Sequence, residues 1–236
     1  MITGTKPPIV LCLSDYVKQT VRAHYALAED RLATLFNAVD LVKFDPAARP
    51  QCRAAIRGQF SIDPRRTVGL MIAQDFARKG LEPALRALAR VAERPVLVVV
   101  GKEDPSAYRR LADELGVAGD VVFAGATSDP YAFYAASDFF ILPTRHDPCS
   151  LVVLEALAMG LPVISTKQNG ACEIMTTGEH GYVLDSADDA KGLVAAVSSL
   201  CDGATRGVMR EKCLALRPGL AYAAHLETLL AIYGRK

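Results

Sequence analysis

The stretch 139–173 constrains the fold of this chain more than any other part of its sequence. It contains two short apolar runs, Phe139–Leu142 and Val163–Ser165, of the continuous kind that forms strands covered on both faces of a parallel sheet. Between them, Leu151–Met159 is long and apolar enough for a buried helix, and Gly160 would end it. A strand, a helix and a second strand in this order predict a β-α-β unit, and therefore a parallel sheet.

The same alternation of strand and helix recurs along the rest of the chain. Further strands are expected at 67–73, 95–100, 121–123 and 182–184, and further helices at 81–92, 106–115, 131–136, 187–201, 205–216 and 220–233. This pattern predicts one α/β domain, a Rossmann-like parallel sheet with helices on both faces. The first 45 residues fit it less well and make a β-α-β piece of their own, with Ser14 as the N-cap of their helix. We therefore predict three parts, at 1–45, at 46–66 (a linker with a helix) and at 67–236.

Charged residues stand at two predicted strand ends. Asp147 lies in the polar loop after the strand at 139–142, and Glu155 is the one carboxylate on the apolar helix for which Ser150 is a candidate N-cap. Arg78 and Lys79 occupy the corresponding place after the strand at 67–73. In open α/β sheets, ligands bind outside the carboxyl ends of the strands, where helix N-termini present free N–H groups to anions. The alternative is that these side chains are solvated charges at the ends of helices.

Composition narrows the class of protein. Of the 236 residues, 51% are hydrophobic and 22% charged, which is typical of a soluble globular protein, and a net charge of +1 gives no general attraction to nucleic acid. No apolar run approaches the roughly 20 residues of a membrane span, and no signal peptide opens the chain. The six cysteines contain no CxxC motif, the four histidines are scattered and no Asp-x-Asp pair occurs, so we expect reduced cysteines, a cytoplasmic location and no metal.

The signature around Asp147 resembles that of a known family. Asp147, seven intervening residues, Glu155 and the following Ala-Leu-Ala-Met-Gly-Leu-Pro-Val-Ile are similar to the motif of family-4 retaining glycosyltransferases, which have the GT-B fold. The segments 75–80, Asp-Phe-Ala-Arg-Lys-Gly, and 99–105, Val-Val-Gly-Lys-Glu-Asp-Pro, resemble the phosphate loop and the next strand end of the lipopolysaccharide core glucosyltransferase I group. With gaps, the resemblance extends from about residue 10 to about residue 200. It implies that the chain is one half of a GT-B fold.

The resemblance implies a role for each matching residue. Arg78 and Lys79 would contact the diphosphate of a nucleotide-sugar donor, and Glu155 would accept hydrogen bonds from both ribose hydroxyls. Asp147 would lie near the transferred sugar, where direct catalysis, sugar positioning and a structural role in the loop all remain open. The further donor-binding positions are those that offer backbone groups to the sugar, phosphate or base, namely Cys149, Ser150, Leu151, Val152, Gly101 and Ala126. Glu173 is a weaker candidate, because an acid at the start of a helix is an equally good explanation.

Several positions depart from the family pattern. Asp147 stands where Glu is more frequent, Cys149 replaces a common aromatic residue, and Ser150 replaces a common Gly. Many members also carry a further Arg on the strand-turn before the phosphate loop, where this chain has Ala-Gln-Asp at 73–75. The departures at Cys149 and Ser150 fall in the loop that would contact the sugar, so donor preference is expected to differ there.

The resemblance implies the transfer of a hexose from a nucleotide-sugar, with UDP-glucose as the first choice, to a glycan or lipid-linked acceptor with retention and without a metal. Residues 1–45 resemble the end of the acceptor-side N-terminal domain, so this chain alone is expected to be inactive. The alternative is a stand-alone nucleotide-sugar binding or partner-dependent interaction module without activity of its own. A UDP-sugar epimerase of the same fold is a third hypothesis.

A basic stripe raises the question of membrane contact. Arg49, Arg53 and Arg57 fall four apart in a predicted helix, near Lys43 and the pair at 65–66. Such a face can bind anionic lipid at the inner face of a membrane, although a solvated helix face is the simpler explanation.

Overall fold

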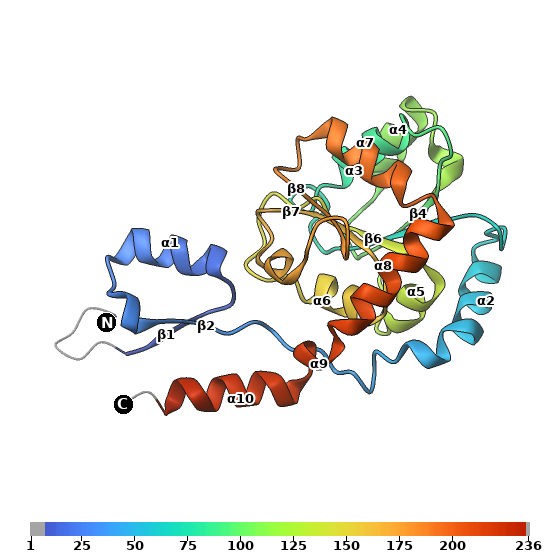
Figure 1. The fold of residues 1–236 in the computed structure, drawn as a ribbon. Helices are drawn as coiled ribbons and strands as arrows, with labels where there is room; N and C mark the ends of the chain where they lie inside the picture. Colours follow the sequence, from blue (N-terminus) through green and yellow to red (C-terminus); the bar gives the residue numbers. More distant parts are fainter. Residues whose placement is uncertain (1–7, 235–236) are drawn as a thin grey trace.

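The computed structural model describes residues 8–234, apart from the side chains of Ala48 and Arg49, and most of them surround a six-stranded parallel sheet (Figure 1). The strands of this sheet are β3 (Val68–Ile72), β4 (Val96–Val100), β5 (Val121–Gly125), β6 (Phe139–Ile141), β7 (Val163–Thr166) and β8 (Gly181–Leu184). Their order is β5-β4-β3-β6-β7-β8, and all neighbouring pairs are parallel. The predicted Rossmann-like sheet is confirmed.

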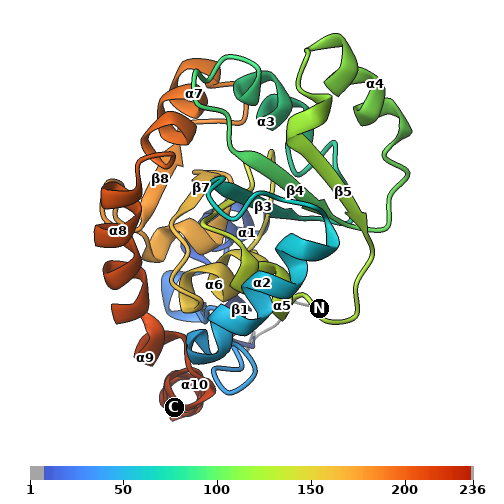
Figure 2. The same ribbon diagram turned by 90° about the vertical axis from the view of Figure 1, so that its right-hand side faces the viewer.

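Helices cover both faces of the sheet, as Figure 2 shows. One face carries α3 (Leu81–Leu88), α4 (Ser106–Glu114) and α7 (Ala190–Ser199). The other carries α2 (Arg49–Gln59), α5 (Tyr131–Ala136) and α6 (Leu151–Ala158), with α8 (Gly203–Ala215) packed against α6. Short 3-10 helices lie at Glu29–Arg31, Pro46–Ala48, Ala118–Asp120 and Gly170–Ile174. Because the central strands are covered on both sides, β4 and β6 are buried along their whole length.

Local sequence explains most of the helix boundaries. Gly160, which follows the C-cap residue Met159 of α6, adopts φ +71°, the left-handed conformation expected of a terminating glycine. Ser14 accepts a hydrogen bond from the backbone of Val17 and so caps the first helix as predicted. The expected cap at Ser150 is wrong in one respect, since its side chain makes no capping hydrogen bond to α6. Its backbone N–H is instead held by the side chain of Asn169, at 3.2 Å.

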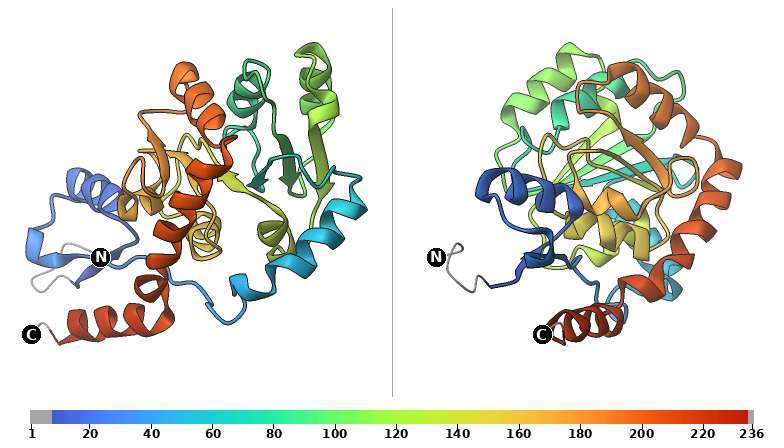
Figure 3. Two further views of the ribbon diagram at one scale, coloured as in Figure 1. Left: turned by 45° about the vertical axis from the view of Figure 1, so that its right-hand side comes forward. Right: turned by 60° about the vertical axis from the view of Figure 1, so that its left-hand side comes forward.

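The N-terminal segment forms a smaller unit beside the main sheet. Strands β1 (Val10–Cys12) and β2 (Leu32–Thr34) pair in parallel, and α1 (Asp15–Tyr25) covers one of their faces. The last helix, α10 (Tyr222–Tyr233), follows the short α9 (Arg217–Leu220) and covers the other face. Figures 1 and 3 show this layering of α1, the two strands and α10 at one side of the molecule. The last helix of the chain therefore packs against its first strands. The predicted division into 1–45, 46–66 and 67–236 instead assigned this helix to the main domain.

The connections of the sheet create a topological switch point. From β3 the chain continues to β4 and β5 on one side, whereas β6 lies on the other side of β3 and continues to β7 and β8. In open α/β sheets, ligands bind outside the carboxyl ends of the strands at such a switch point, which here lies between β3 and β6. No helix in the described part of the chain combines the length and the apolar character that crossing a bilayer requires.

Candidate active site

Two predicted site residues meet at the switch point. Lys79, just before α3, forms an ion pair with the carboxylate of Asp147 in the loop after β6. The side chains are only 12% and 10% exposed, respectively, so water screens their charges less than it would on an open surface. The structure thus places a partly buried cation and a carboxylate side by side where an anionic ligand would approach.

Arg78 joins the same two loops. Its guanidinium donates from Nε to Asp75 at 3.1 Å and from Nη1 to the carbonyl of His146 at 2.9 Å. In the opposite direction, the backbone N–H of Arg145 donates to the carbonyl of Arg78, at 2.9 Å. These contacts hold the loop with Asp147 against the loop with Lys79.

Two glycines permit this close approach of the strand ends. Gly80 has φ +81°, and a Cβ there would lie 2.1 Å from the carbonyl oxygen of Pro143. Gly101 directly follows β4, and a Cβ there would lie 2.1 Å from the carbonyl oxygen of Ala73. The packing of neighbouring strand ends is therefore a sufficient reason for glycine at 101. Ala126 follows the end of β5 and is exposed, so both positions line the same edge of the sheet as the ion pair.

The backbone of Asp147 is fixed by the turn after β7. Its N–H donates to the carbonyl of Gln168 at 2.8 Å, and its carbonyl accepts from the N–H of Gly170 at 3.0 Å. The side chain of Asn169, between them, accepts from the N–H groups of Ser150 and Ala171. The backbone of Asp147 is thus held by the loop after β7, and its carboxylate is held by Lys79 from the loop after β3.

The residues at 149–152 form the N-terminal turn of α6, whose first N–H groups have no partner within the helix. Cys149 and Ser150 are buried, Val152 is half-buried and Leu151 is 44% exposed. The carbonyl of Cys149 accepts a hydrogen bond from the side chain of Asn37, at 3.0 Å. Burial raises the pKa of the Cys149 thiol to about 11, so this thiol is neutral at physiological pH.

Glu155 is largely buried. It is 9% exposed, and one of its carboxylate oxygens accepts a hydrogen bond from the hydroxyl of Tyr134 at 2.7 Å. Burial raises the pKa of Glu155, and the Tyr134 hydroxyl opposes that rise. Tyr134 was missed by the sequence analysis, because nothing in its predicted helix at 131–136 indicated a partner 21 residues away.

The N-terminal unit contacts this site through α1. The carboxylate of Glu173 accepts hydrogen bonds from the backbone N–H groups of Asp15, at 2.8 Å, and Tyr16, at 2.6 Å. A carboxylate at a helix N-terminus is stabilised by the free N–H groups and by the helix dipole. Beside it, the hydroxyl of Tyr16 and Nδ1 of His146 are hydrogen-bonded at 2.8 Å. Glu173 therefore accepts hydrogen bonds from the N-terminus of a helix, and this helix is α1 of the N-terminal unit.

The basic stripe does not form the exposed face that the sequence suggested. Arg53 and Arg57 both form ion pairs with Asp138, at 2.9 and 2.8 Å, and both donate to the carbonyl of Ala136. Arg57 is only 3% exposed. These two arginines therefore turn toward the core, and the side chain of Arg49 lies outside the described residues.

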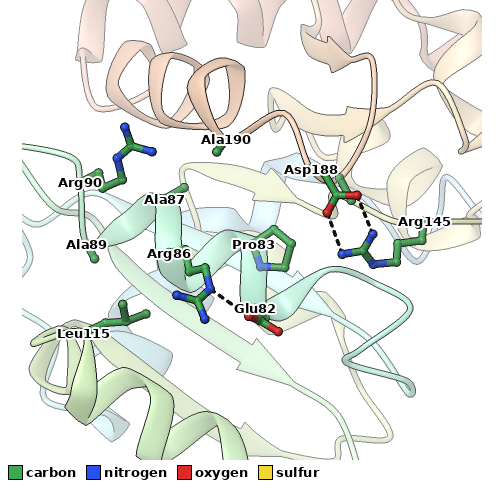
Figure 4. A pocket seen from close by; sticks show the side chains of 11 residues that line it. Glu82, Pro83, Arg86, Ala87, Ala89, Arg90, Leu115, Arg145, Asp188 and Ala190 are labelled. Atoms are coloured by element: carbon green, nitrogen blue, oxygen red, sulfur yellow. Dashed lines mark hydrogen bonds and ion pairs between the residues drawn. The ribbon is translucent and has the colours of Figure 1, made fainter.

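A separate cavity of about 480 Å³ lies along α3 and the start of α7 (Figure 4). Two ion pairs border it, Arg86 with Glu82 and Arg145 with Asp188. None of the predicted site residues is among the described residues that line it. The described residues also contain no group of three or more His, Cys, Asp or Glu that could hold a metal ion, and metal independence stays a prediction.

A doubly wound parallel sheet with charged side chains at its switch point is the architecture of nucleotide-binding α/β domains. Residues 66–203, more than half of the chain, match the family described as "Glycosyl transferases group 1", and the protein belongs to this family. Its fold is one half of a GT-B glycosyltransferase fold.

Relatives of known sequence agree with this assignment. The chain is 35% identical over 136 residues to the lipopolysaccharide core biosynthesis glycosyltransferase LpsE of Rhizobium meliloti. The aligned region is 57% of this chain and 40% of LpsE. It is 27% identical over 179 residues to the lipopolysaccharide glucosyltransferase WaaG of Escherichia coli, covering 74% of this chain and 48% of WaaG. The chain thus spans less than half the length of these two relatives.

Solved structures show the same fold. A crystal structure of WaaG matches with a TM-score of 0.83 at 23% identity, over 99% of this chain and 65% of that one. The Anabaena protein HepE, solved in complex with UDP and glucose, matches with a TM-score of 0.83 at 18% identity, over 98% of this chain and 64% of that one.

Proposed function

We propose that this chain is the donor-binding half of a retaining glycosyltransferase that transfers a hexose from a nucleotide-sugar, with UDP-glucose as the first candidate. The observation that carries the proposal is the ion pair of Lys79 and Asp147 at the switch point, bordered by Arg78. The UDP and glucose bound to HepE and the glucosyltransferase name of WaaG support the choice of base and sugar. The lipopolysaccharide relatives support a glycan or lipid-linked acceptor.

The chemistry of the donor fits the charges of this site. When the bond between the anomeric carbon and the phosphate oxygen breaks, negative charge grows on the departing diphosphate. Fixed cations that bind this charge more strongly in the transition state than in the ground state accelerate the step. Arg78 and Lys79 can supply these charges without a metal, and Glu155 can accept hydrogen bonds from the ribose. Asp147 already holds Lys79, so a diphosphate would have to compete with it.

The proposal assigns acceptor binding to a further domain. Helix α10 exposes a stripe of large apolar side chains, Tyr222, Leu226, Leu230 and Tyr233. This stripe favours a covering acceptor-binding domain, consistent with the greater length of the relatives. We expect nucleotide binding by this chain alone, but no efficient transfer. A partner-dependent module without activity of its own is the second candidate, and the same apolar stripe supports it. A cytoplasmic location remains part of the proposal.

Calorimetric titration of the chain with UDP, GDP and ADP, in buffer with EDTA, tests the proposal. We expect saturable binding of UDP that is lost in Glu155→Ala and in the double variant Arg78→Ala plus Lys79→Ala. Arg86→Ala is the matched control, because Arg86 lies in α3, directly downstream of Arg78 and Lys79, and pairs with Glu82 away from the switch point. Absence of binding by the folded chain to all three nucleotides would contradict the proposal, and binding that requires added metal would contradict its metal independence.

A further inference from the structure

Tyr134 is a fully buried tyrosine in the middle of α5. Its side chain is 0% exposed and its ring packs against Phe44 and Phe140, with centroid distances of 5.7 and 5.9 Å. A buried hydroxyl is destabilising unless it finds a hydrogen-bond partner. Here the partner is a carboxylate, Oε2 of Glu155, at 2.7 Å, with the carbonyl of Val152 farther away at 3.1 Å.

The second oxygen of Glu155 is left available. In the described part of the structure, Tyr134 is the hydrogen-bond donor to this carboxylate, and it contacts Oε2 alone. Gln168 is the one residue there with a fully buried side-chain polar atom that lacks a partner. The other oxygen of Glu155, Oε1, is therefore not sealed in the core and retains contact with solvent. Because Tyr134 fixes Oε2, the carboxylate has a defined orientation, and Oε1 can accept a hydrogen bond from a ligand.

We propose that Tyr134 is a positioning residue for nucleotide recognition: its hydroxyl fixes one oxygen of Glu155, so that the carboxylate accepts hydrogen bonds from the ribose hydroxyls of a nucleoside diphosphate. This inference rests on the proposed function, because it takes Glu155 as the ribose-binding residue. It adds a residue outside the signature and a reason for burying a tyrosine in α5.

The hydroxyl also affects the charge of Glu155. Burial raises the pKa of Glu155, whereas the hydrogen bond from Tyr134 and the charge of Lys43 both lower it. A protonated carboxyl donates one hydrogen bond and loses acceptor capacity, so ribose binding requires the ionised form. Binding is therefore present above the pKa of Glu155 and is lost as the pH falls through it. Removal of the Tyr134 hydroxyl moves this loss to higher pH.

Tyr134→Phe tests the inference, because it removes the hydroxyl and keeps the packed ring. At neutral pH we expect UDP binding by calorimetry to weaken about tenfold, the range of a hydrogen bond to a charged group. In a Glu155→Gln background the same substitution should have no further effect on UDP affinity. Tyr182→Phe is the matched control, since its hydroxyl also has a hydrogen bond, to Ser199 at 2.6 Å, at a site distant in the sheet order.

The titration of Glu155 gives a readout that does not require nucleotide. The side-chain carboxyl signal of Glu155, assigned in ¹³C NMR spectra by its loss in Glu155→Gln, should titrate at higher pH in Tyr134→Phe than in the wild type. Wild-type UDP affinity in Tyr134→Phe, or an equal loss in the Glu155→Gln background, would overturn the inference alone. No UDP binding by the wild-type chain would overturn the proposed function and this inference with it.

Discussion

Replacing Asp147 by asparagine should strengthen the binding of UDP to this chain while it removes a carboxylate from the proposed active site. In the structure, Asp147 forms an ion pair with Lys79, whose ammonium group we expect to bind the donor diphosphate. An anionic ligand must therefore approach a carboxylate of the same charge, or displace it from Lys79. Asparagine is close in size to aspartate and removes this competition without leaving a cavity.

The magnitude follows from the geometry of a shared ammonium. A charge-assisted hydrogen bond is about 2.8 Å long, so two anions held by one Nζ lie at most about 5.6 Å apart. Because the two side chains are only 12% and 10% exposed, an effective dielectric constant of about 20 is appropriate. Two unit charges about 5.6 Å apart then repel by about 3 kcal/mol, which corresponds to roughly a hundredfold change in affinity.

Calorimetric titrations of the wild type and Asp147→Asn with UDP and with uridine measure this effect. The dissociation constant of UDP should fall roughly a hundredfold, whereas that of uridine, which carries no phosphate, should not change. The gain should shrink as ionic strength rises. Asp188→Asn is the control, because it removes an exposed carboxylate that is paired with Arg145 outside the switch point. Unchanged or weaker UDP binding in Asp147→Asn would refute the idea that Asp147 and the diphosphate compete for Lys79.

Three further predictions concern other contacts. Arg57→Ala should lower the free energy of unfolding by about 3–5 kcal/mol, because it breaks a buried ion pair, whereas the more exposed Arg53→Ala should cost less. Urea denaturation compares the two variants, and equal losses would contradict this account. Glu173→Gln should speed amide hydrogen exchange in α1 but not in the main sheet, because it removes the negative charge that holds the N-terminus of α1. Unchanged exchange in α1 would contradict this prediction. Burial raises the pKa of the Cys149 thiol to about 11, so Cys149 should resist alkylation at pH 8 until the chain unfolds, whereas the half-buried Cys52 should react first. Peptide mass spectrometry measures this order, and earlier labelling of Cys149 would contradict the prediction.

The sequence was sufficient for the parts of the fold that depend on local pattern. Continuous apolar runs identified the strands of the main sheet, because a strand covered on both faces cannot alternate with polar residues. The stop at Gly160 and the cap at Ser14 followed from backbone chemistry that acts within a few residues. The signature with Asp147 and Glu155 identified the family, since its spacing is itself a local property.

Contacts between distant segments could not be obtained in this way. The stripe of Arg53 and Arg57 has the spacing of an exposed basic face, yet both side chains turn inward to Asp138, about 80 residues later in the chain. The hydroxyl of Tyr134 finds Glu155 only because α5 and α6 cover the same face of the sheet. Each of these partners is chosen by strand order, which no local pattern encodes.

The sequence by itself determined the class of fold, the family and the residues that face the carboxyl ends of the strands, because these depend on hydrophobic periodicity and short motifs. Only the tertiary structure decided that β3 and β6 are neighbours, that Lys79 therefore holds Asp147, and that α10 returns to pack on the N-terminal strands. The physical reason is that ion pairs and buried hydrogen bonds are short-ranged in space but unrestricted in sequence. Their partners are fixed only when the whole chain has folded.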